Sequence, residues 1–195
     1  WIASGRHGEM KYLEARDDAG GLKRASLARV APWARSVIVC AVNYNTEQPY
    51  STQLNEPSRG WISRYAWSRE DYHDSVLRGL RQVEAAIQDD LPNHQSPTTD
   101  HSFRSYVDTG PLVERVYAKH AGIGWAAKNT CIINQTLGSW LFLGVILTSL
   151  ELNADVPAPD RCGSCTRCIE ACPTQAIVGP GELDARLCIS YLTIE

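Results

Sequence analysis

The alternation of hydrophobic and polar positions predicts several β-strands along this chain. Residues 36–44 (SVIVCAVNY) and 140–149 (WLFLGVILTS) are apolar runs of strand length, which are typical of buried strands. Shorter apolar runs at 103–107 and 131–134 predict two further strands, and a turn at Gly138 separates the second of these from 140–149. These runs supply the strands of a sheet.

Two other stretches have helical periodicity. Between 69 and 91 the apolar residues fall at positions 72, 76, 80, 83, 87 and 91, the spacing of an amphipathic helix, and Pro92 is expected to end it. Residues 111–121 predict a second helix, with Pro111 in its first turn and Gly122 as its stop. Strands and helices therefore alternate.

Polar and proline-containing stretches divide the chain. Residues 45–60 and 92–102 are expected to be loops, and 151–160 (ELNADVPAPD) is expected to be a linker. We therefore predict an α/β (α+β) fold: a sheet-and-helix domain at 1–155, followed by a small cysteine-rich module at 156–195.

Composition narrows the possible classes of protein. With 195 residues, 44% of them hydrophobic, the chain can bury a core, and a net charge of −3 gives no overall basic excess for nucleic acid. A local basic patch stays possible, because Lys and Arg are spread over both halves. No apolar run approaches the ~20 residues of a membrane span, so no membrane partner is expected. The chain begins at Trp1 and ends directly after a helix-like stretch, so we expect a fragment.

Four cysteines near the C-terminus are the clearest chemical signal. Cys162, Cys165, Cys168 and Cys172 read C-x2-C-x2-C-x3-C-P, the spacing of [4Fe–4S] ligands in bacterial ferredoxins. The first three can hold one cluster, and the fourth points toward a second. A disulfide framework and a zinc knuckle are the alternatives. The first is typical of small extracellular chains and the second of separated CxxC pairs, so iron–sulfur is favoured.

A count of thiolates suggests that ligands are missing. Two clusters with four cysteines each need eight thiolates, and this region offers the four above plus Cys188. Cys40 and Cys131 lie in apolar runs and are expected to be core residues. We therefore expect that this chain does not hold both clusters, and that the protein works in a reducing compartment.

A second signal is the segment V-D-T-G-P-L-V-E-R at 107–115. Asp108 follows a predicted strand and precedes a predicted helix, where Asp is a favoured N-cap. The functional alternative is an acid–base group at the carboxyl end of the strand. Apolar neighbours would raise the pKa of such a group, so that it keeps a proton to donate.

Two further segments are open to more than one interpretation. A-G-I-G-W-A-A-K-N (121–129) allows a close approach of the backbone to a ligand but lacks the Rossmann and P-loop fingerprints; the alternative is a turn with a solvated Lys128. In G-W-I-S-R-Y-A-W (60–67), aromatic side chains beside Arg64 either stack on a base or form a packed rim. His73 is expected on a helix face, without a metal role.

Seven segments, taken in order, resemble a known family. The chain is similar throughout to the epoxyqueuosine reductases, which are cobalamin-dependent iron–sulfur enzymes of tRNA modification. The segments lie at 1–13, 63–67, 71–73, 107–115, 121–130, 162–177 and 188–195.

The resemblance implies a specific activity. The family reduces epoxyqueuosine at the tRNA wobble position to queuosine, with base-off cobalamin and two [4Fe–4S] clusters. Asp108 falls at the position of the family's proton donor. The first three cysteines of the run are implied to bind one cluster, and Cys172 and Cys188 the other, with the remaining ligands in a later cysteine motif.

The resemblance also implies cofactor contacts and partners. A tRNA with epoxyqueuosine in its anticodon loop and an external low-potential electron donor are the expected partners of a monomeric, cytoplasmic enzyme. Ala127 stands where related sequences often have Gly. The implied cobalamin contacts are Arg24, Ser63, Asp108, Ile132, Gln135, Leu143 and Ser190.

Two other functions remain open. A reductive dehalogenase would share the cofactors but act on a halogenated substrate, and it predicts an export signal before Trp1. A non-catalytic electron carrier, with 1–155 as a docking domain, predicts that no cobalamin is bound.

Overall fold

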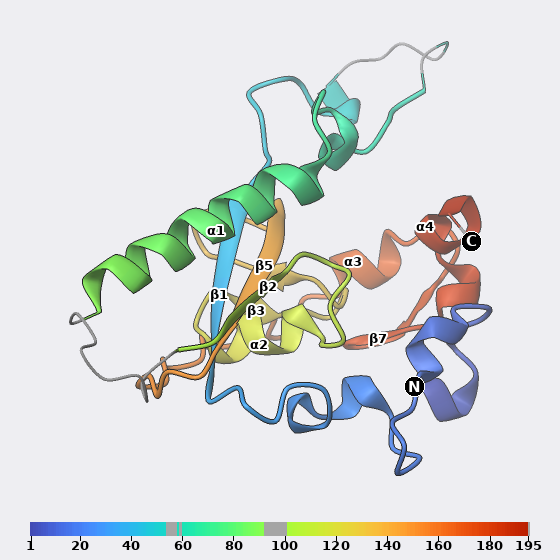
Figure 1. Ribbon diagram of the computed structural model, residues 1–195. Helices are drawn as coiled ribbons and strands as arrows, with labels where there is room; N and C mark the ends of the chain where they lie inside the picture. The colour runs from blue at the N-terminus through green and yellow to red at the C-terminus, as the bar shows by residue number, and fades with distance from the viewer. Residues whose placement is uncertain (54–57, 59, 92–100, 195) are drawn as a thin grey trace.

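The centre of the molecule is a three-stranded antiparallel sheet with the order β1-β5-β2. The computed structural model describes residues 1–53, 58, 60–91 and 101–194 (Figure 1). The strands are β1 (Ser36–Asn43), β5 (Leu141–Thr148) and β2 (Phe103–Tyr106). All three lie where the apolar runs predicted them. Parts of the predicted loops at 45–60 and 92–102 lie outside the described residues, as does the predicted stop at Pro92.

The central strand β5 is paired on both sides. Its register with β1 runs from Ser36 opposite Thr148 to Asn43 opposite Leu141, and Phe103 of β2 also lies opposite Thr148. Successive side chains of a strand point to opposite faces, so each face of the sheet receives its own apolar set. Both faces are covered.

Helix α1 (Tyr72–Asp90) covers one face of the sheet, as Figure 1 shows. Its buried residues Val76 and Leu80 pack with Ile146 of β5 and Val107. The helix begins three residues later than predicted, because the Asp71 side chain accepts a hydrogen bond from the His73 N–H and caps it.

The opposite face packs against the segment before β1 and against α2 (Glu114–His120). The predicted start of this helix at 111 is wrong. Leu112 is only 2% exposed and packs in the core with Ala31 and Val145. Burial of Leu112 therefore holds residues 111–113 outside the helix. The predicted stop is confirmed, since Gly122 has φ 72° directly after the C-cap.

A short hairpin follows α2. Strand β4 (Ile132–Ile133) confirms the predicted strand at 131–134, whereas its partner β3 (Trp125–Ala126) was not predicted. A Cβ on Gly124 would lie 2.2 Å from the Ile133 carbonyl oxygen. The close backbone approach expected in the A-G-I-G-W segment is therefore made by the chain to itself.

The C-terminal part is a small module after an extended linker. Residues 151–160 contain no helix or strand, in agreement with the prediction. The module consists of α3 (Arg167–Glu170), the antiparallel pair β6 (Ile177–Gly179) and β7 (Glu182–Leu183), and α4 (Ile189–Ile194). Short 3-10 helices occur at Ile2–Ser4, Lys11–Glu14, Lys23–Ala25, Leu27–Arg29, Ser51–Gln53, Arg64–Ala66 and Ala185–Leu187.

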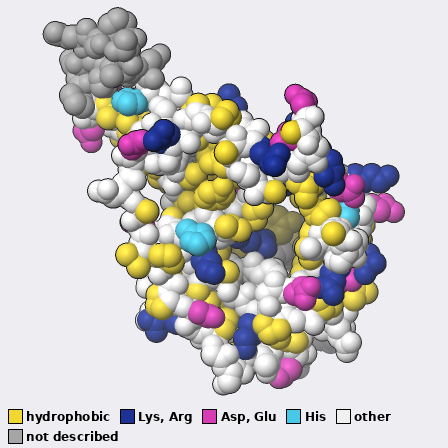
Figure 2. Space-filling model, turned by 90° about the horizontal axis from the view of Figure 1, so that it is seen from below, with side chains coloured by type: hydrophobic (Ala, Val, Ile, Leu, Met, Phe, Trp, Pro, Cys, Tyr) yellow, Lys and Arg dark blue, Asp and Glu magenta, His cyan; other side chains and the backbone are white. Residues whose placement is uncertain are grey.

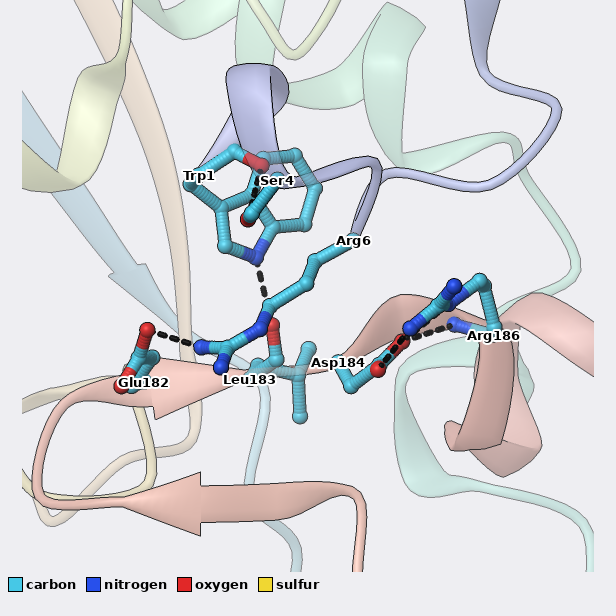
Figure 3. Close-up of polar contacts among 7 residues, drawn as sticks. All are labelled: Trp1, Ser4, Arg6, Glu182, Leu183, Asp184 and Arg186. Carbon is cyan, nitrogen blue, oxygen red and sulfur yellow. Dashed lines mark hydrogen bonds and ion pairs between the residues drawn. The ribbon is translucent and has the colours of Figure 1, made fainter.

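The first residues of the chain lie against this module (Figures 1 and 3). The Trp1 indole donates a hydrogen bond to the Leu183 carbonyl, and Arg6 pairs with Glu182. The Ala185 N–H donates to the Arg6 carbonyl at 2.9 Å. The two ends of the described chain therefore form one contact region, and the division at 155/156 stays a prediction.

None of the helices in the described part of the chain has both the length and the apolarity that a bilayer span requires.

Candidate active site and cysteine loop

Two cavities lie on either side of a shared wall formed by Asp108, Glu114 and Arg115. The tyrosine cavity, about 540 Å³, is lined also by Tyr12, Tyr44, Tyr65, Tyr72, Leu141, Phe142, Leu143 and Ser190. The N-terminal cavity, about 660 Å³, is lined also by Trp1, Ile2, Ala3, Leu13, Leu22, Arg24, Ala25, Leu112 and Val113. The face seen in Figure 2 is hollowed, with hydrophobic side chains at the rim and basic side chains within.

Asp108 occupies an unusual backbone conformation two residues after the end of β2. Its φ is 54°, in the left-handed region, and the Thr109 N–H donates to the Val107 carbonyl at 2.6 Å. The predicted capping role is wrong, because the N-cap of α2 is Val113 and makes no side-chain cap. The Asp108 side chain is 57% exposed, so apolar enclosure of its carboxylate is not found. A sharp turn therefore presents this carboxylate to both cavities.

Tyr72 and His73, in the first turn of α1, face Asp108. The Tyr72 hydroxyl donates to Asp108 Oδ2, and His73 Nε2 lies 3.8 Å from the same atom. Tyr72 stacks on Phe142 of β5 with ring centroids 4.3 Å apart. Burial raises the pKa of Tyr72, and the hydrogen bond to Asp108 adds to the rise, so the hydroxyl keeps its proton and stays a donor.

The sequence did not assign a site role to Tyr72 or His73. Asp71 orients the imidazole, since its Oδ1 lies 2.8 Å from His73 Nδ1. An Asp N-cap followed by Tyr and His was the available signal, because it places both side chains in a first helical turn. Only the packing of α1 on β5 turns the side chains of Tyr72 and His73 toward Asp108.

Glu114 is a second carboxyl group of the shared wall, and the sequence did not single it out. It is the first residue of α2, and its Oε1 is buried with no hydrogen-bond partner among the described residues. Burial raises the pKa of Glu114, and the Asp108 carboxylate adds to the rise. The Glu114 backbone N–H, Arg24 and Arg115 act in the opposite direction.

The predicted cobalamin contacts fall into two groups. Leu143 and Ser190 line the tyrosine cavity and Arg24 lines the N-terminal cavity, so these three surround Asp108. The Arg24 guanidinium also donates to the Leu112 carbonyl at 3.0 Å, which holds it at the wall. Four of the predicted contacts therefore lie together.

The other three predicted contacts lie apart from this wall. Ser63 lines a separate cavity of about 310 Å³. Ile132 is buried in β4, and Gln135 is exposed in the turn that follows it. Neither is a lining residue of the two cavities at Asp108.

Arg64 lies inside an aromatic cluster beside Ser63. Only 7% of it is exposed, and it donates to the Gln48 carbonyl at 2.6 Å and to Asn45 Oδ1 at 2.9 Å. Its guanidinium lies 4.2 Å from the Tyr50 ring centroid. For Arg64 the packed-rim interpretation is therefore confirmed, while Trp61 stays 43% exposed.

The cysteine loop is built from tight turns. All seven cysteines are free thiols. The Cys165 N–H donates to the Cys162 carbonyl at 2.9 Å, and Asp160 Oδ1 accepts from the Cys162 N–H at 2.8 Å. Cys168 lies on α3. These free thiols at tight spacing agree with a metal-binding role rather than a disulfide framework.

Cys172 has the surroundings of a thiolate. Its Sγ accepts a hydrogen bond from the Ala176 N–H at 3.3 Å. Backbone N–H groups, first that of Ile177 and then that of Ala176, lower the pKa of Cys172. The donor type therefore fits an iron–sulfur ligand.

The predicted ligands do not converge. In the described ranges, no three His, Cys, Asp or Glu side chains form a group that could hold a metal ion. The loop thus offers thiols at the right spacing without a closed site. Cys40 lies instead among the residues packed under α1, and burial raises its pKa, as expected of a core cysteine.

Lys128 joins the hairpin to the cysteine loop. Its Nζ donates to the Gly163 carbonyl at 2.8 Å and to the Cys165 carbonyl at 2.9 Å. Its own carbonyl accepts from the Gly181 N–H at 2.9 Å. The alternative of a solvated lysine is therefore wrong, and a positive charge lies against the backbone that carries the predicted ligands.

Comparison with protein families defines the class. Residues 161–195 match a 4Fe-4S double cluster binding domain, and residues 24–109 match the family described as epoxyqueuosine reductase QueG, DUF1730. The chain is thus an α+β domain joined to an iron–sulfur cluster binding module.

Individual relatives agree over the full chain. An epoxyqueuosine reductase of Synechocystis sp. is 43% identical over 195 residues, which cover 100% of this chain and 62% of that protein. The chain belongs to the epoxyqueuosine reductase family. It covers 48% to 62% of the length of the curated relatives it matches.

Solved structures of the family have the same fold. An epoxyqueuosine reductase crystallised with an epoxyqueuosine-modified tRNA-Tyr stem loop has a TM-score of 0.78 and 36% identity, over 98% of this chain and 48% of that one. The Bacillus subtilis enzyme, with an aspartate catalytic loop swung out of its active site, has a TM-score of 0.76 and 34% identity over the same shares.

Proposed function

We propose that the full-length protein reduces epoxyqueuosine to queuosine at the wobble position of tRNA. The observation behind this proposal is the strained turn that presents Asp108 to two cavities, with Tyr72 and His73 against its carboxylate. Family membership and the tRNA stem loop bound by a relative support the same substrate. The aspartate catalytic loop of the Bacillus subtilis enzyme supports Asp108 as the proton donor.

The proposed cofactors are base-off cobalamin and two [4Fe–4S] clusters. Cobalamin would supply reduced cobalt to open the epoxide, and the clusters would supply it with electrons. The fit rests on this chain's residues. The two cavities at Asp108 have room and a mixed apolar and polar lining for a large macrocycle with amide side chains, with Leu143, Ser190 and Arg24 on their walls.

Residues around Asp108 and in the cysteine loop have separate roles in this proposal. Asp108 donates a proton to the epoxide oxygen as the ring opens. The Tyr72 hydroxyl, which keeps its proton, holds that carboxyl group in place. The stacking of the Tyr72 ring on Phe142 fixes the position of that hydroxyl. Cys162, Cys165 and Cys168 would hold one cluster, and Cys172 and Cys188 part of the other.

Three further proposals concern the surroundings of the enzyme. The electrons come from an external low-potential donor, because each reduction of an epoxide to an alkene consumes two electrons. The protein acts in the cytoplasm, where free thiols such as the seven in this chain stay reduced. The protein is also proposed to act as a monomer.

Replacement of Asp108 by Asn tests the proposal in the full-length protein with reconstituted clusters. Asn tolerates the left-handed backbone, so the fold is expected to persist. Loss of the donated proton is expected to lower queuosine formation about 100-fold or more. Nucleoside mass spectrometry of the tRNA measures the product, and absorption spectra measure corrinoid binding, which is expected to be unchanged.

The matched control is Asp89→Asn, an exposed residue near the end of α1. It should behave as the wild-type protein does. Product formation by Asp108→Asn at the wild-type rate would remove Asp108 from the mechanism. A wild-type protein that takes up iron but no corrinoid would contradict the proposed function and favour an electron carrier.

A further inference from the structure

Reduction of an epoxide to an alkene consumes two protons. Two C–O bonds break, a C=C bond forms, and the oxygen leaves as water. The two electrons come one at a time from the low-potential donor of the proposed function. Asp108 has one proton to give in each pass, so the site needs a second source for the proton that converts the released oxygen into water.

Glu114 is placed to be that source. It lies six positions after Asp108, and both carboxyl groups line both cavities. A substrate oxygen in either cavity is therefore in reach of the same wall. Glu114 is the first residue of α2, and its own backbone N–H favours the anion once the proton has left.

The bonding of Glu114 favours the protonated form before the reaction. Its Oε1 is buried and has no hydrogen-bond partner within the described residues. An unpaired buried carboxylate oxygen is costly, whereas a neutral carboxyl group is far less so. The two cations at the wall donate elsewhere: Arg24 to the Leu112 carbonyl and Arg115 to the Thr130 carbonyl at 3.3 Å.

The charged groups that face Glu114 have opposing effects on its pKa. Burial is the largest influence and raises it, and the Asp108 carboxylate, which forms once Asp108 has given its proton, raises it further. The Glu114 backbone N–H, Arg24 and Arg115 lower it, and the net direction is upward. Loss of the Asp108 charge would reduce this rise, so the two carboxyl groups are coupled.

We propose that Glu114 delivers the second proton of the reduction, an assignment that rests on the proposed function. Asp108 protonates the epoxide oxygen as the first C–O bond breaks, which leaves a hydroxyl group on the neighbouring carbon. The O–H bond of Glu114 then breaks, and its proton passes to the oxygen of this hydroxyl group. Water leaves with the second C–O bond, and the electron pair on the first carbon forms the C=C bond. Solvent in the N-terminal cavity restores the Glu114 proton.

The test compares Glu114→Gln with Glu151→Gln in the full-length enzyme. Gln keeps the shape of the side chain but has no proton to give, and Glu151 is exposed in the linker, 72% of its side chain being accessible. We expect kcat for queuosine formation to fall at least 10-fold in Glu114→Gln. KM for the tRNA and corrinoid uptake should stay at wild-type values. Glu151→Gln should match the wild type throughout.

A second readout needs no activity. An unfolded Glu titrates at its ordinary pKa of 4.5 and the folded Glu114 above it. Stability of the cofactor-free protein is therefore unaffected by this group below the unfolded pKa. As the pH rises past that value, the buried Glu114 resists ionisation and the folded state becomes less stable. This loss of stability is complete above the folded pKa. In Glu114→Gln this loss should be absent, so the variant should melt at a higher temperature than wild type at pH 8 and at a similar one at pH 4.

The outcomes are distinguishable. Turnover of Glu114→Gln within two-fold of wild type would overturn the proposal for Glu114 and leave the proposed function standing. Loss of corrinoid uptake in Glu114→Gln would make Glu114 a cofactor contact and also overturn it. A wild-type enzyme that forms no queuosine would instead contradict the proposed function itself.

Discussion

At the scale of single residues, the site depends on one hydrogen bond across the sheet. The Tyr72 hydroxyl donates to Asp108 from α1, and Asp108 lies in the turn that follows β2. The two residues lie 36 positions apart in the sequence, so the fold brings them together. The stacking of Tyr72 on Phe142 places the ring, and the left-handed turn places the carboxylate.

Tyr72→Phe is expected to weaken this arrangement without removing the ring. A hydrogen bond to a neutral carboxyl group contributes about 0.5–1.5 kcal/mol, so turnover should fall roughly 2- to 10-fold. The stack on Phe142 should keep the fold and corrinoid uptake intact. Single-turnover assays on modified tRNA measure the effect. Tyr117→Phe, a core residue of α2, is the control, and equal rates for the two variants would deny Tyr72 a role.

At the scale of elements, the cysteine loop is held by the β3–β4 hairpin through Lys128. The ammonium group donates to two carbonyl groups of the loop, 35 and 37 positions further along the chain. Because Lys128 bonds to backbone carbonyl groups, these contacts do not depend on the side chains of the loop. They do depend on the position of the hairpin.

Lys128→Met is therefore expected to loosen the loop. Two charge-assisted bonds at a half-buried position contribute roughly 1–3 kcal/mol, and solvent screening puts the expected loss near the lower end. The loop should become more sensitive to proteolysis, and backbone amide exchange at 163–165 should accelerate. Lys23→Met, on an exposed 3-10 helix, supplies the control. Unchanged amide exchange in Lys128→Met would mean that the loop is stable without the bonds from Lys128.

The strands were the most predictable elements. β1 and β5 are long apolar runs rich in β-branched residues, and such runs are visible in the sequence. β3 has two residues and depends on pairing with β4, so no periodicity marks it. The start of α2 was mispredicted because the burial of Leu112 overrides the preference of Pro111 for a first helical turn.

The site was predictable only in part. The cysteine spacing and the segment around Asp108 are local patterns, and the resemblance rests on them. Glu114 and Lys128 were missed because their surroundings come from distant segments: the roles of both depend on which backbone groups and cavities the fold brings to them. A charged residue has no sequence signature that separates a solvated position from a buried one.

At the scale of the whole molecule, the two ends of the chain build the tyrosine cavity together. Tyr12 comes from the N-terminal segment and Ser190 from α4. The Tyr191 hydroxyl accepts a hydrogen bond from the Glu9 N–H at 2.8 Å, beside Gly8. The contacts in Figure 3 join the same two ends of the chain.

Gly8→Ala tests this contact. Gly8 has φ 61°, and a Cβ there would lie 2.6 Å from the Tyr191 hydroxyl oxygen. The matched control is Gly20→Ala, since Gly20 has φ 80° with nothing within 4 Å of the added atom. Both should lose about 1 kcal/mol to backbone strain. Only Gly8→Ala should also displace Tyr191, so denaturant titrations should give it the larger loss. Equal losses of stability in the two variants would mean that the contact between Gly8 and Tyr191 does not stabilise the fold.

The left-handed turn at Asp108 restricts which amino acid can serve as the acid there. Asp and Asn tolerate this conformation because their short side chains bond to the local backbone, whereas longer or branched residues are strained in it. Glutamate has the same carboxyl group on a longer side chain, yet the left-handed backbone conformation disfavours it. Chemistry and conformation thus select the same residue, and an exchange of carboxylates that looks conservative would be a poor one at this position.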